Sequence, residues 1–288
     1  ALAGRLDRPD VTFEASSTRL NYGDEHQLAS LKAKGSWQGE AIALDLQTGE
    51  YRAGTQSYLH KLTFALAGTE SRHQLSLTAD IDKANKLQFL ANGGLTSNGR
   101  NRDGFQWRGT IEQLALAGSI PFKLVTRPEI ILSPEQVMLG HTRLTVASGN
   151  IDIQKASWTP ENWATEGTFE QIVLPTDAAV TATSKPLTVD GRWQLTANQQ
   201  LSGNIRLQRT SGDWVLPLET PFALGLQTLS LELLAEGNTA NGQLIVEGTH
   251  IGKTLASVKL PLQRTEQTWQ IKPDTPISGN LQFNLPDL

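Results

Sequence analysis

The feature that most constrains the fold is an alternation of apolar and polar residues with a period of two, repeated in short runs along the chain. Leu201, Ile205 and Leu207 occupy odd positions among polar residues, and the run 229–233 shows the same pattern. Residues at positions i and i+2 lie on one face of an extended strand. Each run is followed by glycine, asparagine, aspartate or a charged residue, which are typical strand and turn boundaries. The pattern predicts successive antiparallel strands.

Few segments depart from this pattern. The stretch 157–166 is the best candidate for a helical turn, because Thr159 can cap a helix that begins at Pro160. In the N-terminal region we expect short strands at 11–13 and 20–22, with a turn at Pro9 and Asp10. The segment 93–104 is the most loop-like, and its Asn-Gly pair at 98–99 favours a solvated hairpin tip over a phosphate-binding loop.

The domain organisation follows from what the chain lacks. No composition shift, linker or charge block marks a boundary, so we expect 1–288 to form one continuous elongated β domain. Roughly 20 strands spaced about 4.8 Å apart would make a sheet on the order of 100 Å long, which must close, stack or curl. The sequence therefore predicts an all-β fold with almost no helix, an elongated and curled antiparallel sheet with an apolar concave interior. Because position 1 is alanine, we expect a fragment of a longer protein.

Composition and motifs argue against several ligand classes. The formal net charge of −4 provides no basic field for nucleic acid, and cysteine is absent. No apolar run approaches the roughly 18 residues of a membrane helix. Residues 248–254 resemble a phosphate-binding loop, but Glu247 stands where that motif has glycine and a strand pattern follows instead of a helix. We expect no nucleotide and no nucleic acid as partner.

No catalytic or metal-binding constellation is visible. Asp80 and Asp82 lie two apart on a predicted strand face, but Lys83 and Asn85 follow them and indicate a solvated strand end. The chain has five histidines, at His26, His60, His73, His141 and His250. No two of them have the spacing of a metal site. We therefore expect no enzyme activity, no cofactor and no metal.

The functional candidates are the apolar residues on the predicted inward face, which we call the groove residues. A long aliphatic trough would suit fatty acyl chains, since each buried methylene gains about 0.8 kcal/mol on leaving water. The sequence does not decide between an open groove and a filled core. The groove residues are Leu44, Leu46, Leu62, Phe64, Leu66, Leu116, Leu144, Val146, Leu195, Ile205, Leu207, Leu229, Leu231, Leu233, Leu244, Val246, Leu260 and Leu262.

An ordered series of short motifs resembles the TamB family, the translocation and assembly module subunit. The resemblance is close over 100–288 and loose over 1–99, and it suggests a middle-to-late fragment of such a protein. The motifs are Trp107-x-Gly109, Leu114-x-Leu116, Pro121-Phe122-x-Leu124, Trp163-x-x-Glu166-Gly167, Gly191-x-Trp193-x-Leu195, Leu201-x-Gly203, Arg209-x-x-Gly212-Asp213-Trp214, Gly225-Leu226 and Leu285-Pro286-Asp287-Leu288.

The resemblance implies a fold, a place and partners. Members resemble AsmA-like and bridge-like lipid transfer proteins, are anchored in the inner membrane of diderm bacteria, and cross the periplasm as a taco-shaped β-sheet. They work with the outer-membrane barrel TamA through their C-terminal end. The implied roles are phospholipid passage toward the outer membrane and assembly of outer-membrane proteins such as autotransporters. The anchor and the TamA-binding region are expected outside this chain.

The four residues of the most distinctive motif are interpreted as structural. Arg209 and Asp213 can pair across a turn, Gly212 can supply a positive φ, and Trp214 begins the next strand.

Rival interpretations remain open. A β-solenoid adhesin would be a structural scaffold with a dry packed core, and a periplasmic lipopolysaccharide-bridge protein would be a shorter transport fold. A carbohydrate-active enzyme would need clustered carboxylates beside an aromatic strip. We interpret the seven tryptophans as core-edge packing instead; they are Trp37, Trp107, Trp158, Trp163, Trp193, Trp214 and Trp269.

Overall fold

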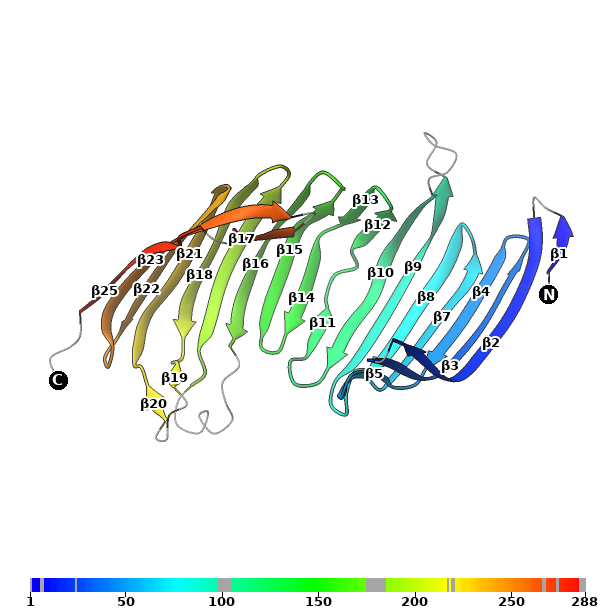
Figure 1. Cartoon of the computed structure of the whole chain (residues 1–288), viewed down its shortest axis with the longest axis horizontal. Helices are drawn as coiled ribbons and strands as arrows, with labels where there is room; N and C mark the ends of the chain where they lie inside the picture. The colour runs from blue at the N-terminus through cyan, green and yellow to red at the C-terminus, as the bar shows by residue number, and fades with distance from the viewer. Residues whose placement is uncertain are drawn as a thin grey trace. The chain divides into compact units, whose positions relative to one another are not determined.

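The computed structural model describes residues 2–5, 8–23, 25–97, 105–174, 185–216, 218, 221–265, 268–272 and 275–284. These residues form 25 β-strands and no helix, which confirms the all-β fold class (Figure 1). Contacts divide the chain into two units, Ala1–Leu144 and Thr145–Leu288. The expectation of one continuous domain over 1–288 stays a prediction.

The first unit is an antiparallel meander in which each long strand pairs with the next one along the chain. β1 pairs with β2, β5 and β6 form a small hairpin beside the end of β3, and β11 pairs with the end of β10. The strands are β1 (Leu2–Arg5), β2 (Arg8–Tyr22), β3 (His26–Gln38), β4 (Ala41–Thr48), β5 (Tyr51–Ala53), β6 (Gln56–Leu59), β7 (Lys61–Thr69), β8 (Arg72–Asp80), β9 (Lys86–Ser97), β10 (Phe105–Ala117), β11 (Phe122–Leu124), β12 (Glu129–Ser133), β13 (Gln136–Leu139) and β14 (Thr142–Val146), which crosses the boundary.

The second unit repeats this plan. The last part of β23 leaves its partner β22 and pairs with β24, while β19 and β20 form a separate two-stranded sheet. The strands are β15 (Gly149–Trp158), β16 (Trp163–Val173), β17 (Thr188–Ala197), β18 (Leu201–Ser211), β19 (Val215–Leu216), β20 (Phe222–Ala223), β21 (Leu226–Gly237), β22 (Thr239–Gly248), β23 (Gly252–Thr265), β24 (Thr268–Ile271) and β25 (Ser278–Asn284).

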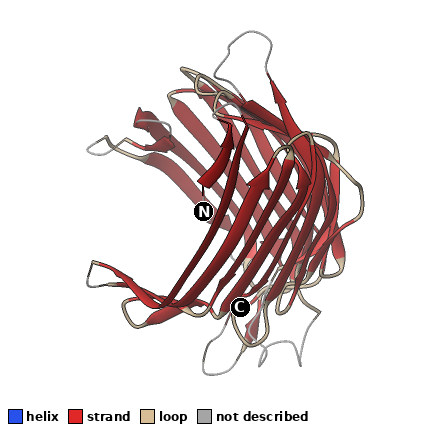
Figure 2. Cartoon of the chain, turned by 90° about the vertical axis from the view of Figure 1, so that its right-hand side faces the viewer, coloured by secondary structure: helices blue, strands red, loops and turns tan. Residues whose placement is uncertain are grey.

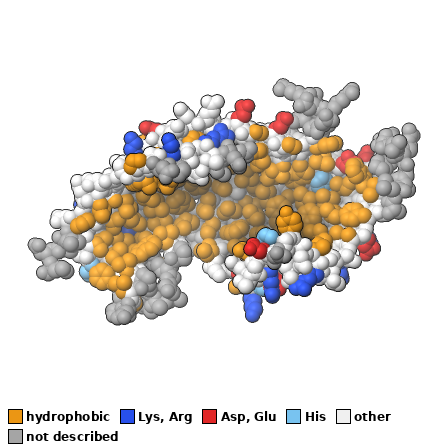
Figure 3. All heavy atoms as spheres, viewed as in Figure 1, with side chains coloured by type: hydrophobic (Ala, Val, Ile, Leu, Met, Phe, Trp, Pro, Cys, Tyr) orange, Lys and Arg blue, Asp and Glu red, His pale blue; other side chains and the backbone are white. Residues whose placement is uncertain are grey.

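The sheet of each unit curls along its strands, so that one face is concave (Figure 2). Hydrophobic side chains gather on the hollowed face, and charged side chains lie mainly at its borders (Figure 3). This distribution follows from the period-two alternation, because one set of alternate residues shares the concave face and the other faces outward. The curled antiparallel sheet predicted from the sequence is confirmed.

β-bulges explain why the apolar positions change from odd to even within single strands. The pairing of β9 and β10 shifts between Ile111 and Gln113, so Ile111 and Leu114 lie on the same face although they are three residues apart. A similar shift between Ile153 and Lys155 changes the phase of β15.

Two local predictions are wrong. Residues 157–166 contain no helix: β15 ends at Trp158, β16 begins at Trp163, and the Thr159 hydroxyl accepts the Asn162 N–H at 3.1 Å in the hairpin turn between them. Residues 8–22 form one strand, not two short strands after a turn, because the whole segment pairs with β3 or β1. The long tertiary pairing overrides the turn tendency of Pro9.

Two predictions fall outside the described residues: the hairpin tip at 98–99 and the terminal motif at 285–288. In the part of the chain that the structure describes, no helix has the length and apolar character needed to span a bilayer.

Candidate functional site: an apolar concave face

In the first unit, the groove residues form rows that run across the strands. Leu44 pairs with Leu66, and Leu46 pairs with Phe64. Directly opposed residues of an antiparallel pair project to the same face, so these pairs extend into rows over seven strands. The rows are Phe13, Gly35, Leu44, Leu66, Leu75, Ala91 and Ile111; Ala15, Ala33, Leu46, Phe64, Leu77, Phe89 and Leu114; and Ser17, Leu31, Thr48, Leu62, Ala79, Leu87 and Leu116.

The opposite face of the same strands is polar. One row there contains Glu14, Lys34 and Asp45, followed by Ala65 and Ser76. The face carrying the groove residues is therefore distinguished by chemistry as well as by curvature.

The second unit repeats the arrangement. Leu207 pairs with Leu231 and Ile205 with Leu233, and the rows continue on both sides. They are Phe169, Gly191, Leu207, Leu231, Leu244, Ala256 and Leu281; Gly167, Trp193, Ile205, Leu233, Gly242, Val258 and Gly279; and Thr165, Leu195, Gly203, Ala235, Ala240 and Leu260.

Five groove residues stand apart from these rows. Leu262 lies beyond the part of β23 that pairs with β22 and pairs with Ile271 of β24. Leu144 and Val146 lie in β14, on either side of the boundary between the units. Leu229 pairs with Val246 at one end of the second unit's concave face.

All eighteen groove residues are half-buried, neither enclosed as in a core nor fully exposed. The ten buried apolar residues among those described include three alanines that lie in or beside the rows, Ala79, Ala91 and Ala235. Protein interiors are normally filled to the density of organic crystals. The apolar side chains of the concave face therefore have partners along the sheet but are not covered by a second layer over most of their area.

Glycines on the concave face accept aromatic rings from neighbouring strands. A side chain at Gly167 would collide with the indole of Trp193, and one at Gly191 with the ring of Phe169. The rings of these paired strands lie nearly parallel, at an interplanar angle of 22°. Such rings cover the glycine backbone and keep the surface smooth instead of projecting into the hollow. Phe13 covers Gly35 in the first unit in the same way.

One end of the second unit is closed by a packed cluster. Leu187, Val189 and Leu226 are buried, with 0%, 1% and 6% of their surfaces exposed. The groove residues that pack against them are Leu207, Leu229 and Val246. At this end the apolar face is a core, whereas elsewhere it stays half-exposed.

The motif at 209–214 holds this closed end together. The Asp213 carboxylate accepts N–H groups from Trp214, Gly225 and Leu226 at 2.8 to 2.9 Å. The Arg209 guanidinium donates instead to two backbone oxygens, that of Gly212 at 2.8 Å and that of Gln227 at 3.0 Å. No ion pair joins Arg209 to Asp213 in this described segment, so the predicted pairing is wrong. Both side chains instead form their hydrogen bonds with backbone groups, which offer them several partners.

Gly212 has φ of 78°, as predicted for a turn that needs the left-handed region. Trp214 is 40% exposed, and its backbone oxygen accepts the Leu224 N–H at 3.0 Å. These contacts agree with the structural interpretation of the motif.

The strand end predicted at Asp80 and Asp82 is confirmed, because β8 ends at Asp80. Asp82 lies in the following turn and does not share a strand face with Asp80. The Asp82 carboxylate accepts the N–H groups of Ala84 at 2.8 Å and Asn85 at 2.7 Å. A hydrogen bond from the Asn85 side chain, followed by these backbone bonds, lowers the pKa of Asp82. The aspartate therefore acts as a turn cap.

The histidines serve separate local contacts. His73 is buried, its Nε2 accepts the Trp107 indole N–H at 2.7 Å, and its Nδ1 lies 2.9 Å from the Thr69 oxygen. His250 Nδ1 lies 2.8 Å from the Ala223 oxygen. Across the described ranges, no group of three or more His, Cys, Asp or Glu residues is arranged to hold a metal ion.

Sequence reasoning missed several members of the concave face. Phe13, Phe89, Phe169, Trp193 and Leu281 occupy the same rows as the groove residues. The alternation that identified the groove residues also contains these positions, but only the strand register shows that they lie on the same face.

Comparison with known proteins identifies the first unit. Residues 1–126 match the family model described as TamB, N-terminal domain. Residues 1–126 belong to the TamB family. No curated protein and no solved structure matches the chain. The resemblance to TamB seen in the motifs is thereby confirmed, although most of the matched domain lies in 1–99, where the resemblance is loose. The placement of the chain as a middle-to-late TamB fragment is not confirmed. The TamB N-terminal domain matched over residues 1–126 indicates a role in the translocation and assembly module and a bacterial envelope protein.

Proposed function

We propose that the chain is a non-enzymatic lipid conduit of the TamB type. Its concave face holds phospholipid acyl chains, and no residue performs covalent chemistry. The observation that carries the proposal is that the groove residues in the rows of each unit are half-exposed on that unit's apolar, concave face. Large apolar surfaces left open to water usually serve as binding sites.

The physical driving force is transfer of acyl chains from water to this face. Each methylene that leaves water gains about 0.8 kcal/mol, so even partial burial of an acyl chain gives several kcal/mol. The central rows carry apolar side chains or glycine at each successive strand, as in Leu207, Leu231 and Leu244. A chain can move from strand to strand without crossing a polar barrier, which suits passive sliding.

The TamB resemblance supports the cellular setting that we propose. We place the protein in the periplasm of a diderm bacterium, tethered to the inner membrane, where it passes phospholipids between the inner and outer membranes. It supports assembly of outer-membrane proteins such as autotransporters, together with the barrel TamA.

The rival function is a structural scaffold with a dry core. The packed cluster at Leu187, Val189 and Leu226 favours that function locally, because these side chains are enclosed. The cluster occupies one end of the second unit, however, and Leu231, Leu233 and Leu244 remain half-buried. The test must therefore separate a lipid-binding surface from a core.

The decisive experiment places a charge on the concave face. Leu231→Arg should abolish co-purification of phospholipid, measured by native mass spectrometry, because a guanidinium repels acyl chains from the row. Ser230→Arg is the matched control, since Ser230 precedes Leu231 and pairs with Gln208 and Ile245 on the opposite face. Circular dichroism of both variants establishes folding.

Phospholipid on the wild type and on Ser230→Arg, but not on a folded Leu231→Arg protein, is the expected result. A lipid-free wild type, or equal lipid on both variants, would refute the conduit. Unfolding by Leu231→Arg alone would identify a core and support the scaffold instead.

A further inference from the structure

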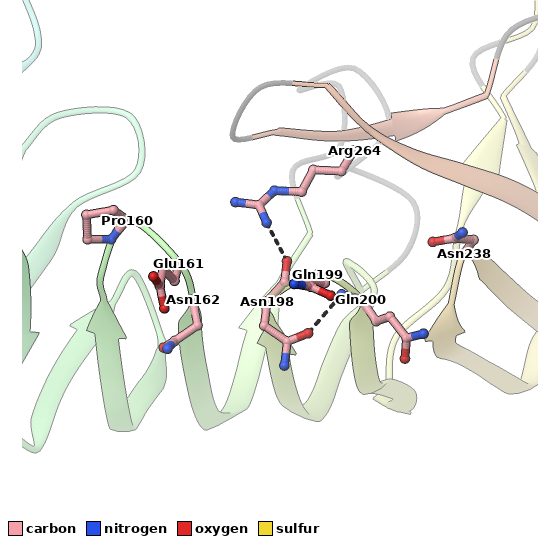
Figure 4. Close-up of a pocket in the computed structure, with 8 residues that line it drawn as sticks. All are labelled: Pro160, Glu161, Asn162, Asn198, Gln199, Gln200, Asn238 and Arg264. Carbon is pink, nitrogen blue, oxygen red and sulfur yellow. Dashed lines mark hydrogen bonds between the residues drawn. The ribbon is translucent and has the colours of Figure 1, made fainter.

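A polar cavity lies at the end of the second unit where its hairpin turns meet (Figure 4). Its volume is about 840 Å³, within the usual size range of small-molecule sites. Three turns contribute to it: the turn between β15 and β16, the turn between β17 and β18, and the turn between β21 and β22. Its lining residues are Pro160, Glu161, Asn162, Asn198, Gln199, Gln200, Asn238 and Arg264.

The cavity borders the apolar face. A second, smaller cavity shares Glu161 and Arg264 with it and is also lined by Trp158, Trp163 and Trp269. Trp163 pairs with Ala197, which pairs with Leu201, so this row belongs to the concave face. A molecule lying on the groove residues would therefore reach the polar cavity at this end of the strands.

The β23 and β24 hairpin places a cation in the cavity. Arg264 pairs with Trp269 across this hairpin, where β23 has left its partner β22. Its Nη1 donates to the backbone oxygen of Asn198 at 2.7 Å, a contact between positions 66 residues apart (Figure 4). The other N–H groups of the guanidinium form no hydrogen bond with a described residue. A guanidinium with free donors is well suited to bind a phosphate.

The cavity also contains one carboxylate. Glu161 lies in the turn between β15 and β16 and forms no ion pair with Arg264 or with another residue in the described ranges. The remaining polar side chains are amides, which offer donors and acceptors without net charge. The cavity thus presents one positive group and one negative group, separately, on a neutral polar background.

We propose that this cavity binds the headgroup of a zwitterionic phospholipid that carries a phosphodiester and a primary amine. The Arg264 guanidinium binds the phosphate, the Glu161 carboxylate binds the ammonium group, and the amides of Asn162 and Gln199 satisfy the remaining polar atoms. The acyl chains lie on the adjoining apolar face. This inference rests on the proposed function and adds a preference for one headgroup class.

The test measures binding of short-chain lipids to the whole chain by native mass spectrometry. The probes are dihexanoyl phosphatidylethanolamine, dihexanoyl phosphatidylglycerol, which lacks the amine, and dihexanoylglycerol, which lacks the headgroup. Glycerophosphoethanolamine supplies the headgroup without chains and separates a lipid from a free phosphate ester.

Two variants separate the two charges. Arg264→Gln should weaken the binding of both phospholipids about tenfold, which is the equivalent of one charge-assisted hydrogen bond. The binding of dihexanoylglycerol should not change. Glu161→Gln should remove the preference for phosphatidylethanolamine over phosphatidylglycerol. Lys259→Gln is the control for Arg264, because Lys259 lies on the same strand at an exposed outward position. Glu236→Gln is the control for Glu161, at an exposed position on β21.

Each outcome decides between the two proposals. Binding of dihexanoylglycerol without any effect of Arg264→Gln overturns the headgroup site and leaves the conduit standing. Absence of binding by every lipid overturns the conduit itself. Equal binding of glycerophosphoethanolamine and dihexanoyl phosphatidylethanolamine would show that the ligand is a free phosphate ester. That result also overturns the lipid headgroup site. The headgroup site is supported if Arg264→Gln weakens phospholipid binding, Glu161→Gln removes the headgroup preference, and the two control variants bind as the wild type does.

Discussion

Replacement of Asp213 by alanine should loosen the closed end of the second unit. The Asp213 carboxylate accepts three backbone N–H groups, from Trp214 at 2.9 Å, Gly225 at 2.8 Å and Leu226 at 2.9 Å. The Gly225 and Leu226 groups lie where β21 begins, and Leu226 belongs to the buried cluster that contains Leu187. Removal of one carboxylate therefore leaves three donors without their acceptor.

The magnitude follows from the surroundings of the three donors. The bonds to Gly225 and Leu226 are partly buried, and an unpaired buried donor costs about 1–3 kcal/mol. The bond to Trp214 is exposed, so water replaces it at little cost. We expect Asp213→Ala to lower the free energy of unfolding by about 3 kcal/mol. Asp213→Asn keeps one oxygen acceptor and should cost about half as much.

Denaturant unfolding measures the free energy, and hydrogen exchange measures the local effect. Protection of the Gly225 and Leu226 amides should fall in Asp213→Ala. The control is Asp45→Ala, since Asp45 is exposed on the outward face of β4, and its replacement should change stability by less than about 0.5 kcal/mol. Unchanged protection, or equal stability loss in both variants, would refute the structural role of the motif.

Two further predictions concern the first unit. His73→Ala removes the acceptor of the Trp107 indole N–H and should destabilise the protein by about 1–3 kcal/mol, with a shifted indole N–H resonance in NMR spectra; an unshifted resonance would contradict the contact. A hydrogen bond from Arg52 is the main cause that lowers the pKa of Glu50 below its ordinary value of 4.5. The ionised contact therefore stabilises the fold above pH 4.5 and is lost as the pH falls through the lowered pKa. A carboxyl NMR titration should show a midpoint below 4.5 that moves upward in Arg52→Gln, and no movement would disprove the assigned cause.

The sequence predicted the strands well because period-two alternation is a local property. Leu62, Phe64 and Leu66 alternate in the sequence and form the centre of β7. The error at 157–166 has a local cause too: Thr159 and Pro160 satisfy the rules for a helix start, but the same hydroxyl group also stabilises a hairpin turn. Strand pairing on both sides then selected the turn.

The register could not be predicted, since it depends on bulges and on partners distant in the sequence. Ile111 and Leu114 reach one face only because the β9 and β10 pairing shifts between them. The polar cavity lined by Arg264 could not be predicted for the same reason. Asn162, Asn198 and Arg264 are ordinary turn or strand residues in the sequence, and only the folded hairpins bring them together.

The two ends of β18 differ, and this difference constrains how a lipid can move in the second unit. Residue 201 lies beside the turn that lines the polar cavity, whereas Arg209 and Gly212 lie at the opposite, packed end. An acyl chain that slid along the strand direction would meet the enclosed cluster around Leu187. Movement across the strands meets no such barrier, because the rows keep aliphatic side chains at successive positions, as in Leu207 and Leu231. If both proposals hold, the lipid therefore moves along the rows, across the strands. Its headgroup lies at the end of the strands that carries the polar cavity, and its acyl chains point toward the packed cluster around Leu187.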